Sequence, residues 1–320
     1  MIIIKKEINV ILSLIDELKD NSIWCGTFNL IWNDFKNDIV KQDIIFTPQL
    51  KIVENLNKNT FNINHLSENS YYKIYGKPSI ELKNKIKEEI KNKFNETSDI
   101  LDDFNYNENK YFLYVMLKKE FKFLNPFSKL SNAPFKNYSN VEYFGINKMT
   151  EDIVRSQVKV LYYNSTTNYA IKLMTKTNDE VIISLGNTSN TFLNIYNEIL
   201  EKTSEYRGNI NLTDTDKVQI PCLNFKIKKE FIELENKPFL FKDKSEYTID
   251  KALQTIQITL DETGGKIKSE AGMTSKMMLS PILPRNFIFN DNFCLFLKEK
   301  DKELPYFAMK VTDIILFKDK

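Results

Sequence analysis

The carboxyl-terminal part of the chain contains the stretch that decides the fold. Residues 251–262 read KALQTIQITLDE, residues 263–285 read TGGKIKSEAGMTSKMMLSPILPR, and residues 286–311 read NFIFNDNFCLFLKEKDKELPYFAMKV. Between Ile256 and Leu260 apolar and polar residues alternate, which is the period of two of a β-strand with one buried face. The first segment is therefore predicted to be a long strand.

The two segments after this strand differ sharply in character. The first contains Gly264, Gly265, Gly272 and two prolines, and it runs for about twenty residues without a helical stripe. A loop of that length inside a compact domain is usually functional or disordered. Residues 293–297 and 306–309 are instead apolar on both faces, on either side of a polar turn. They predict a hairpin in the middle of a sheet that is packed on both sides.

Composition excludes several classes of function. Hydrophobic residues make up 42% of the 320 residues, and 45 basic residues almost balance 43 acidic ones, which leaves a net charge of +2. This balance lacks the concentrated positive charge of proteins that bind nucleic acid or anionic membranes.

The amino terminus and the cysteines indicate the compartment. Lys5, Lys6 and Glu7 interrupt the apolar start of the chain, so we expect neither a signal peptide nor a membrane span. The three cysteines cannot all pair and are predicted to be buried free thiols in a reducing compartment. They are Cys25, Cys222 and Cys294. We expect a soluble, cytoplasmic protein.

The first half of the chain is predicted to be mainly helical. Apolar residues at spacings of three and four predict helices over residues 8–20 and 24–39, and a short one over 49–56. Residues 57–75 are polar and rich in tyrosine, and they are interpreted as irregular. From Ser79, a good helix cap, a narrow apolar stripe with a charged back predicts a helix that lies on a sheet.

The middle of the chain is predicted to be a meander of strands. Apolar residues alternate over 158–162 and 169–173, and a turn at 178–179 precedes the apolar run 181–185. A helix is expected over residues 192–200, where apolar residues again recur at spacings of three and four.

The order of these elements resembles that of the serpins. KALQTIQITLDETGG (residues 251–265) is similar to the strand and hinge before a serpin reactive-centre loop, and FIFNDNFCLFL (residues 287–297) is similar to the signature that follows it. The signature departs from the family's usual residues at Asp291, Asn292 and Cys294.

The resemblance implies a mixed α/β architecture of the α+β, multi-domain class. It implies a large mixed sheet, further antiparallel sheets, helices clustered in the amino-terminal half and an exposed reactive-centre loop. We expect one serpin-like domain over residues 1–320, with a divergent, shortened helical part at 1–75 and the best resemblance at 79–311. Pro126-Phe127 and Pro134-Phe135 match Pro-Phe pairs that serpins carry after the central strand of the large sheet.

The resemblance also implies a mechanism, in which a protease cleaves the loop and its first part inserts into the large sheet as a new strand. The hinge then comprises Glu262, Gly264 and Gly265, followed by the alternating residues that would face the core. If Gly264 is the hinge glycine, the core-facing set is small or apolar; it consists of Gly265, Ile267, Ser269, Ala271 and Met273. If Gly265 is the hinge, Lys266, Lys268 and Glu270 turn inward and forbid insertion, because buried unpaired charges are costly. The clean alternation favours the first register.

The usual loop length of the family places the cleaved bond at Met278-Leu279 in the first register and at Leu279-Ser280 in the second. Either bait side chain, Met or Leu, suits a protease with an apolar primary pocket, such as a chymotrypsin-, elastase- or subtilisin-like serine protease or a papain-like cysteine protease. The alternative is a non-inhibitory interaction protein that binds a partner through the loop or its sheet edges. The shortened amino-terminal half favours it, and Lys266, Ile267 and Lys268 are bulky where family inhibitors carry small residues.

An enzyme is the weakest hypothesis. The single histidine, His65, has no motif around it, and none surrounds any cysteine that could act as its nucleophile. No metal-spaced cluster and no phosphate-binding glycine loop is present in the sequence. We therefore expect no catalytic residue, no cofactor and no metal.

Overall fold

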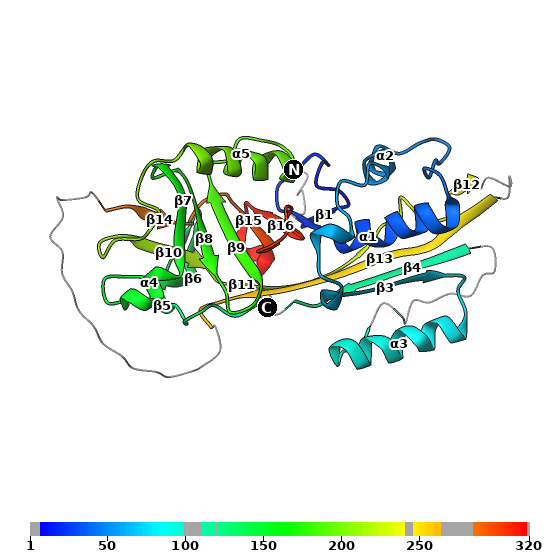
Figure 1. The fold of residues 1–320 in the computed structure, drawn as a ribbon, viewed down its shortest axis with the longest axis horizontal. Coiled ribbons are helices and arrows are strands. Elements are labelled where there is room, and N and C mark those ends of the chain that lie inside the picture. Colours follow the sequence, from blue (N-terminus) through cyan, green and yellow to red (C-terminus); the bar gives the residue numbers. More distant parts are fainter. Residues whose placement is uncertain are drawn as a thin grey trace.

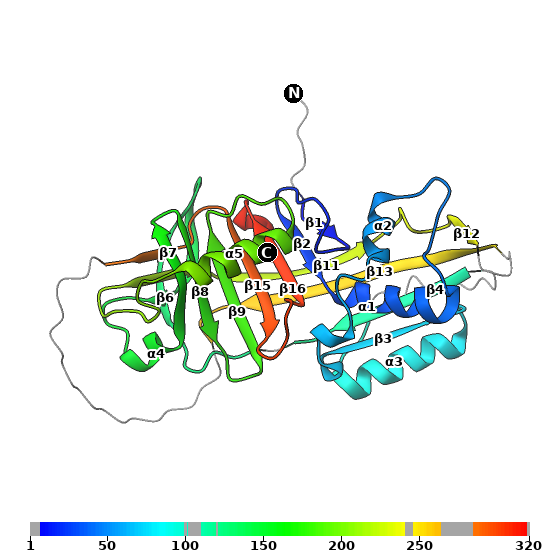
Figure 2. The same cartoon turned by 45° about the horizontal axis from the view of Figure 1, so that its top comes forward.

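The computed structural model describes residues 7–98, 101, 110–119, 121–240, 246–263 and 284–318. Three β-sheets with helices on their outer faces form an elongated molecule, and β13 (Glu246–Leu260) runs along much of its length, as Figures 1 and 2 show. β13 confirms the long strand that was predicted for the segment of residues 251–262.

The large sheet has the strand order β11-β13-β4-β3, with a short strand β12 also paired to β13. β13 runs parallel to β4 and antiparallel to β11 and β12, while β3 and β4 are antiparallel. The bounds are β11 Leu223–Glu230, β12 Pro238–Leu240, β4 Lys110–Leu117 and β3 Tyr71–Gly76.

Helices cover both faces of the large sheet. Successive side chains of β4 point to opposite faces, so Leu113 and Val115 join the main core beside α1 (Thr27–Asp34). Phe112 and Tyr114 join a second, smaller core beneath α3 (Ile80–Phe94), as the two sides of the sheet in Figure 1 show. The prediction that this helix lies on a sheet is confirmed, and the hydroxyl of Ser79 caps it by accepting from the backbone N–H of Leu82.

The second sheet has seven strands in the order β1-β2-β16-β15-β9-β8-β7. The predicted meander and the predicted hairpin meet here, and the hairpin lies in the interior of the sheet with both faces buried. The bounds are β1 Asn9–Ile11, β2 Ser22–Cys25, β16 Phe307–Val311, β15 Phe293–Glu299, β9 Asp179–Leu185, β8 Asn168–Met174 and β7 Val158–Ser165. The helix predicted at residues 192–200 is α5 (Phe192–Glu205), which packs on this sheet.

The third sheet has four strands in the order β14-β10-β6-β5, and it lies at the end of the molecule toward which β13 points (Figure 1). The bounds are β14 Asn286–Ile288, β10 Lys217–Pro221, β6 Tyr138–Ile146 and β5 Ser128–Phe135. The short helix α4 (Asp152–Ser156) follows β6, and a 3-10 turn at Ile314–Phe317 closes the described chain.

The amino-terminal predictions need correction. The helix predicted over residues 8–20 is wrong, because the chain forms β1 and a turn in which the Asp16 carboxylate accepts from two backbone N–H groups. The helix predicted from residue 24 begins at Thr27, because Trp24 belongs to β2, and it continues as a π-helix at Phe35–Val40. The short helix predicted over residues 49–56 is α2 (Lys51–Asn57).

Residues 57–75 are only partly irregular. Two 3-10 turns, Ile63–His65 and Glu68–Ser70, precede β3, so the tyrosine-rich end of this segment is a strand. The single domain over residues 1–320 stays a prediction. Within the described ranges, none of the helices is both long enough and apolar enough to cross a membrane.

Candidate functional site

The candidate site begins where β13 ends, beside the four-stranded sheet. The backbone N–H of Phe127 donates to the carbonyl oxygen of Glu262 at 3.1 Å. The Glu262 carboxylate forms an ion pair with Lys129 at the start of β5, with 3.1 Å between Oε1 and Nζ. The exit of β13 is thereby attached to β5, the edge strand of the neighbouring sheet.

The electrostatics of this attachment are mild. Glu262 is largely covered, with 14% of its side chain exposed, whereas 78% of the Lys129 side chain is exposed. The hydrogen bond and charge of Glu262 raise the pKa of Lys129. Solvent screens such an exposed pair, so it contributes little to stability. The attachment therefore holds the strand end weakly.

The large sheet is divided along β13. Among the described residues, β13 pairs with β4 only over residues 248–252 and 110–113, with a register shift between Ile249 and Lys251. Beyond this point, residues 253–260 pair with β11 on the other side, and β4 continues to Leu117 paired with β3. We call the boundary between residues 253–260 of β13 and residues 114–117 of β4 the fork.

The two faces of β13 along the fork differ in burial. Gln254, Ile256 and Leu260 are buried in the main core, and the Gln254 amide donates to the carbonyl oxygen of Cys25 at 3.3 Å. On the opposite face, Leu253 belongs to the smaller core beneath α3, whereas Gln257 and Thr259 are exposed. A strand placed in the fork would therefore have one face against the main core, and beside Gln257 and Thr259 its other face would open toward solvent.

Most of the predicted site residues lie outside the described residues. These are Gly264, Gly265, Ile267, Ser269 and Ala271 of the hinge, and Met278, Leu279 and Ser280 of the predicted cleaved bond. Glu262 is the one that the structure places, at the exit of β13. The sequence interpretation missed its partner Lys129, although the adjacent Pro126-Phe127 pair had been matched to the family.

The structure gives His65 a local role. Its Nδ1 accepts from the backbone N–H of Asn62 at 3.1 Å, and its ring lies against Phe61 with 5.2 Å between centroids. Burial lowers the pKa of His65. In the part of the chain that the structure describes, no hydrogen bond joins His65 to a cysteine, and no group of three His, Cys, Asp or Glu side chains could hold a metal ion.

The cysteines behave as predicted in two of three cases. Cys25 and Cys294 are buried free thiols, whereas Cys222 is only half-buried. Burial raises the pKa of Cys294 to about 12. Burial and the nearby Glu262 raise the pKa of Cys222 to about 11, so the thiol form prevails at neutral pH in both.

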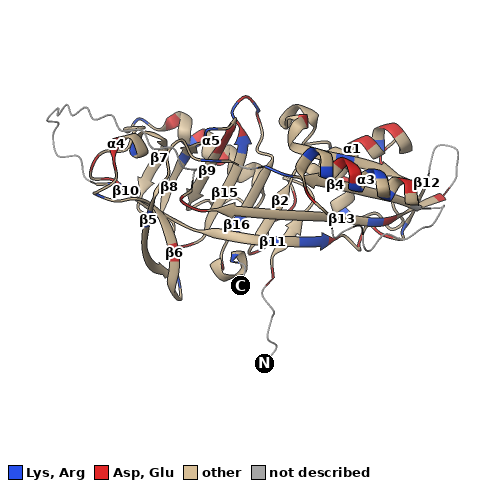
Figure 3. Cartoon of the chain, turned by 90° about the horizontal axis from the view of Figure 1, so that it is seen from below, with Lys and Arg blue, Asp and Glu red and all other residues tan. Residues whose placement is uncertain are grey.

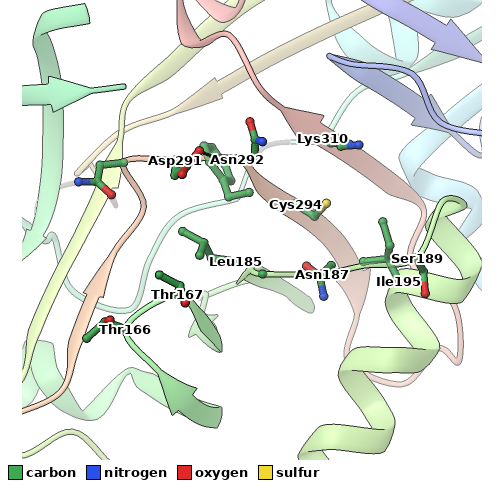
Figure 4. A pocket seen from close by; sticks show the side chains of 13 residues that line it. Thr166, Thr167, Leu185, Asn187, Ser189, Ile195, Asp291, Asn292, Cys294 and Lys310 are labelled. Atoms are coloured by element: carbon green, nitrogen blue, oxygen red, sulfur yellow. Dashed lines mark hydrogen bonds between the residues drawn. The ribbon is translucent and has the colours of Figure 1, made fainter. Parts of the chain in front are cut away.

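A separate cavity of about 340 Å³ lies beside α5 and the ends of β9, β15 and β16. Figure 4 shows Asp291 and Asn292 on one side of it, with Lys310, Asn187 and Ile195 around the other. Its lining is a mixture of amide, hydroxyl and apolar groups. Glu262 is not among the lining residues, so the cavity is distinct from the exit of β13.

No protein-family model and no curated protein matches the chain significantly. Solved structures do match it. Thyroxine-binding globulin in complex with thyroxine is similar with a TM-score of 0.45 and 13% identity over 72% of this chain and 64% of that one. Serpin48 of the insect Tenebrio molitor has a TM-score of 0.44 and 16% identity over 82% and 71%. Maspin has a TM-score of 0.47 and 15% identity over 72% and 65%.

This chain spans about two thirds of the length of thyroxine-binding globulin and of maspin. The molecule itself has the elements that the sequence resemblance implied. A long strand leads out of a large mixed sheet, α3 lies across that sheet, and the chain returns through β14 into a central hairpin of a second sheet. The chain has a mixed α/β, serpin-like fold.

Proposed function

We propose that the chain is a suicide-substrate inhibitor of a serine or cysteine protease with an apolar primary pocket. The protease would be chymotrypsin-, elastase-, subtilisin- or papain-like, and it would cleave at Met278-Leu279, with Leu279-Ser280 as the alternative bond. The segment after β13 would then enter the large sheet as a strand. In this role the chain is a protein ligand of an enzyme and has no catalytic residue of its own.

The observation that carries the proposal is the fork. Residues 253–260 of β13 and residues 114–117 of β4 border it, and each strand is already paired on its other side. Because β13 and β4 are parallel, a strand that turns back from the exit of β13 would be antiparallel to both neighbours. The fork therefore offers two backbone edges to the segment that starts at Glu262.

The burial of β13 supports the register that begins at Gly264. An inserted strand would have to bury one face against the main core beside Gln254 and Ile256. The residues that this register turns inward are small or apolar, while Lys266, Lys268 and Glu270 turn toward the open face. An unpaired charge on the buried face would cost several kcal/mol, enough to prevent insertion.

A matched pair of substitutions tests this proposal. Ser269→Lys places a charge on the inward face, whereas Glu270→Lys exchanges one charge for another on the outward face. Each full-length variant and the wild type are incubated with chymotrypsin or elastase, and covalent complexes are detected by denaturing electrophoresis and mass spectrometry. We expect a complex with the wild type and with Glu270→Lys, and simple cleavage of Ser269→Lys.

A covalent complex with Ser269→Lys would contradict the register that begins at Gly264. The absence of any complex would contradict inhibition, and it is the result expected if Gly265 is the hinge, because Lys266, Lys268 and Glu270 would then turn inward.

A non-inhibitory interaction protein is the second candidate, because Lys266, Ile267 and Lys268 are bulky. It would bind its partner through the predicted loop or a sheet edge. One such edge is β11, whose Lys226 and Lys228 are exposed; Figure 3 shows this basic end of the strand.

A further inference from the structure

A buried arginine lies at the other boundary of the predicted loop. Arg285 follows Pro284 directly and precedes β14. Its backbone N–H donates to Asp216 Oδ1 at 2.8 Å, and its Nη2 donates to Asp216 Oδ2 at 2.7 Å. The Asp216 side chain is fully buried, and only 10% of the Arg285 side chain is exposed.

The rest of the guanidinium is also engaged. Nη1 donates to the Tyr206 hydroxyl at 3.1 Å and to the carbonyl oxygen of Asn209, and Nη2 donates to the carbonyl oxygen of Asn211 at 2.7 Å. The carbonyl oxygen of Arg285 accepts from the backbone N–H of Lys217, the first residue of β10. Arg285 therefore joins the start of β14 to the segment 206–217 through both backbone and side chain.

A second buried arginine binds the same segment. Arg155 of α4 donates through Nη1 to the carbonyl oxygens of Thr213 and Asp216, at 3.1 and 3.2 Å. Its Nη2 donates to the carbonyl oxygen of Asn147. The Asp216 carboxylate thus accepts hydrogen bonds from Arg285, and the backbone carbonyl oxygen of the same residue accepts one from Arg155. Both arginines therefore bind segment 206–217.

The two boundaries of the predicted loop are attached very unequally. At the amino side, Glu262 has one screened ion pair and one backbone hydrogen bond. At the carboxyl side, Arg285 has a buried bidentate ion pair together with several further hydrogen bonds. Charge-assisted bonds of this kind are about twice as strong as neutral ones, and burial protects them from screening.

We propose that Arg285, Asp216 and Arg155 form a clamp that positions the carboxyl boundary of the loop on the four-stranded sheet. When a protease cuts the predicted loop, the clamp keeps β14 in the four-stranded sheet, and the weakly attached segment that begins at Glu262 is the one that moves. This consequence deepens the proposed function and rests on it. The clamp itself is a property of the intact chain and is tested there.

Hydrogen–deuterium exchange of the full chain, before and after proteolytic cleavage, tests the clamp. The informative amides are those of residue 285, Lys217 and Phe289, which donate to Asp216, Arg285 and Gln219. Arg285→Lys keeps the charge but loses the planar fork of donors. Since this variant loses several charge-assisted hydrogen bonds, we expect these three amides to exchange about tenfold faster or more.

Two further variants calibrate the result. Tyr206→Phe removes a single hydrogen bond from Arg285 and should produce a smaller increase at the same amides. Glu262→Gln weakens the opposite boundary and should leave these amides unchanged. In the cleaved wild type, the three amides should remain as protected as in the intact chain.

Unchanged exchange of these three amides in Arg285→Lys would overturn the clamp. Equal acceleration of these amides and of those of β15 would also overturn it, because the residue would then contribute only to global stability. Failure of the proposed function is seen separately, since it would remove the covalent protease complex of the wild type without altering exchange at β14 in the intact chain.

Discussion

Replacing Lys119 with methionine is predicted to destabilise the protein strongly. Lys119 Nζ lies 2.9 Å from Asp179 Oδ1 and 2.6 Å from Glu299 Oε1. The two carboxylate side chains are 3% and 1% exposed. Lys119 follows β4, Asp179 begins β9 and Glu299 ends β15, so the cluster joins the large sheet to the seven-stranded sheet.

The magnitude follows from what methionine leaves behind. Removing one partner of a buried ion pair costs about 3–5 kcal/mol, because the remaining charge is uncompensated. Glu299 keeps hydrogen bonds from the backbone and hydroxyl of Ser67, and Asp179 keeps those from the hydroxyls of Thr177 and Tyr306. We therefore expect a loss of about 3 kcal/mol, at the lower end of that range and a large fraction of a typical total stability of 5–15 kcal/mol.

Urea unfolding at pH 7, followed by the fluorescence of the buried Trp24 and Trp32, measures this loss. Lys51→Met is the matched control, since Lys51 pairs with Glu54 at the surface and should change the free energy of unfolding by less than about 1 kcal/mol. Adding Glu299→Gln to the Lys119 variant should restore part of the loss. A Lys119 variant within 1 kcal/mol of the wild type would refute this reasoning.

Three further predictions concern other parts of the molecule. The thiol of Cys294, with its pKa raised to about 12, should react with a thiol reagent at pH 8 only after unfolding; rapid reaction in the native state would contradict its burial. Gly186→Ala should lower the melting temperature by several degrees, since φ is +84° and a Cβ would lie 2.2 Å from a backbone oxygen, whereas Gly76→Ala, with its nearest atom at 3.5 Å, should have little effect. Burial opposes ionisation of Asp216, but the hydrogen bonds from Arg285 prevail and lower the pKa of its carboxyl group. The ionised carboxylate therefore stabilises the fold above the unfolded-state pKa of about 3.9, and this stabilisation is lost as the pH falls through the lower folded-state pKa. Urea titrations from pH 3 to 7 should show that the difference in free energy of unfolding between the wild type and Asp216→Asn becomes smaller as the pH falls. A difference that grows with acid would contradict a lowered pKa of Asp216.

The elements predicted correctly are those whose signals are local. Ser79, an apolar stripe and a charged back lie within sixteen residues, and they suffice to indicate α3. The hairpin of β15 and β16 is likewise contained in one short stretch of apolar residues and a polar turn. The helix presents one apolar face to the sheet, and each strand of the hairpin has its partner within the same stretch of sequence.

The errors occur where a distant partner decides the structure. Residues 8–20 have helical spacing, but Asn9–Ile11 pairs with β2, which pairs in turn with β16 from the opposite end of the chain. Tyr71–Gly76 lacks a clean alternation, and it becomes a strand because β4 lies beside it. Tertiary pairing overrides local preference at these places.

The same reason limits prediction of the site. Glu262 could be identified from the hinge pattern that follows β13, but nothing near Lys129 in the sequence marks it as a partner of that carboxylate. Arg285 and Asp216 are also separated by many residues, and only the folded chain brings them together.

Thermal unfolding before and after limited cleavage by a chymotrypsin- or elastase-like protease tests the central claim most directly. The full chain is cut, the cut is located by mass spectrometry, and the melting temperature of each form is measured. Our account predicts a cut beside Met278 or Leu279 and a steep rise in melting temperature, because the inserted strand would fill the fork between β13 and β4. A cut chain that melts at the same temperature as the intact chain would contradict insertion and leave an interaction protein with a serpin-like fold.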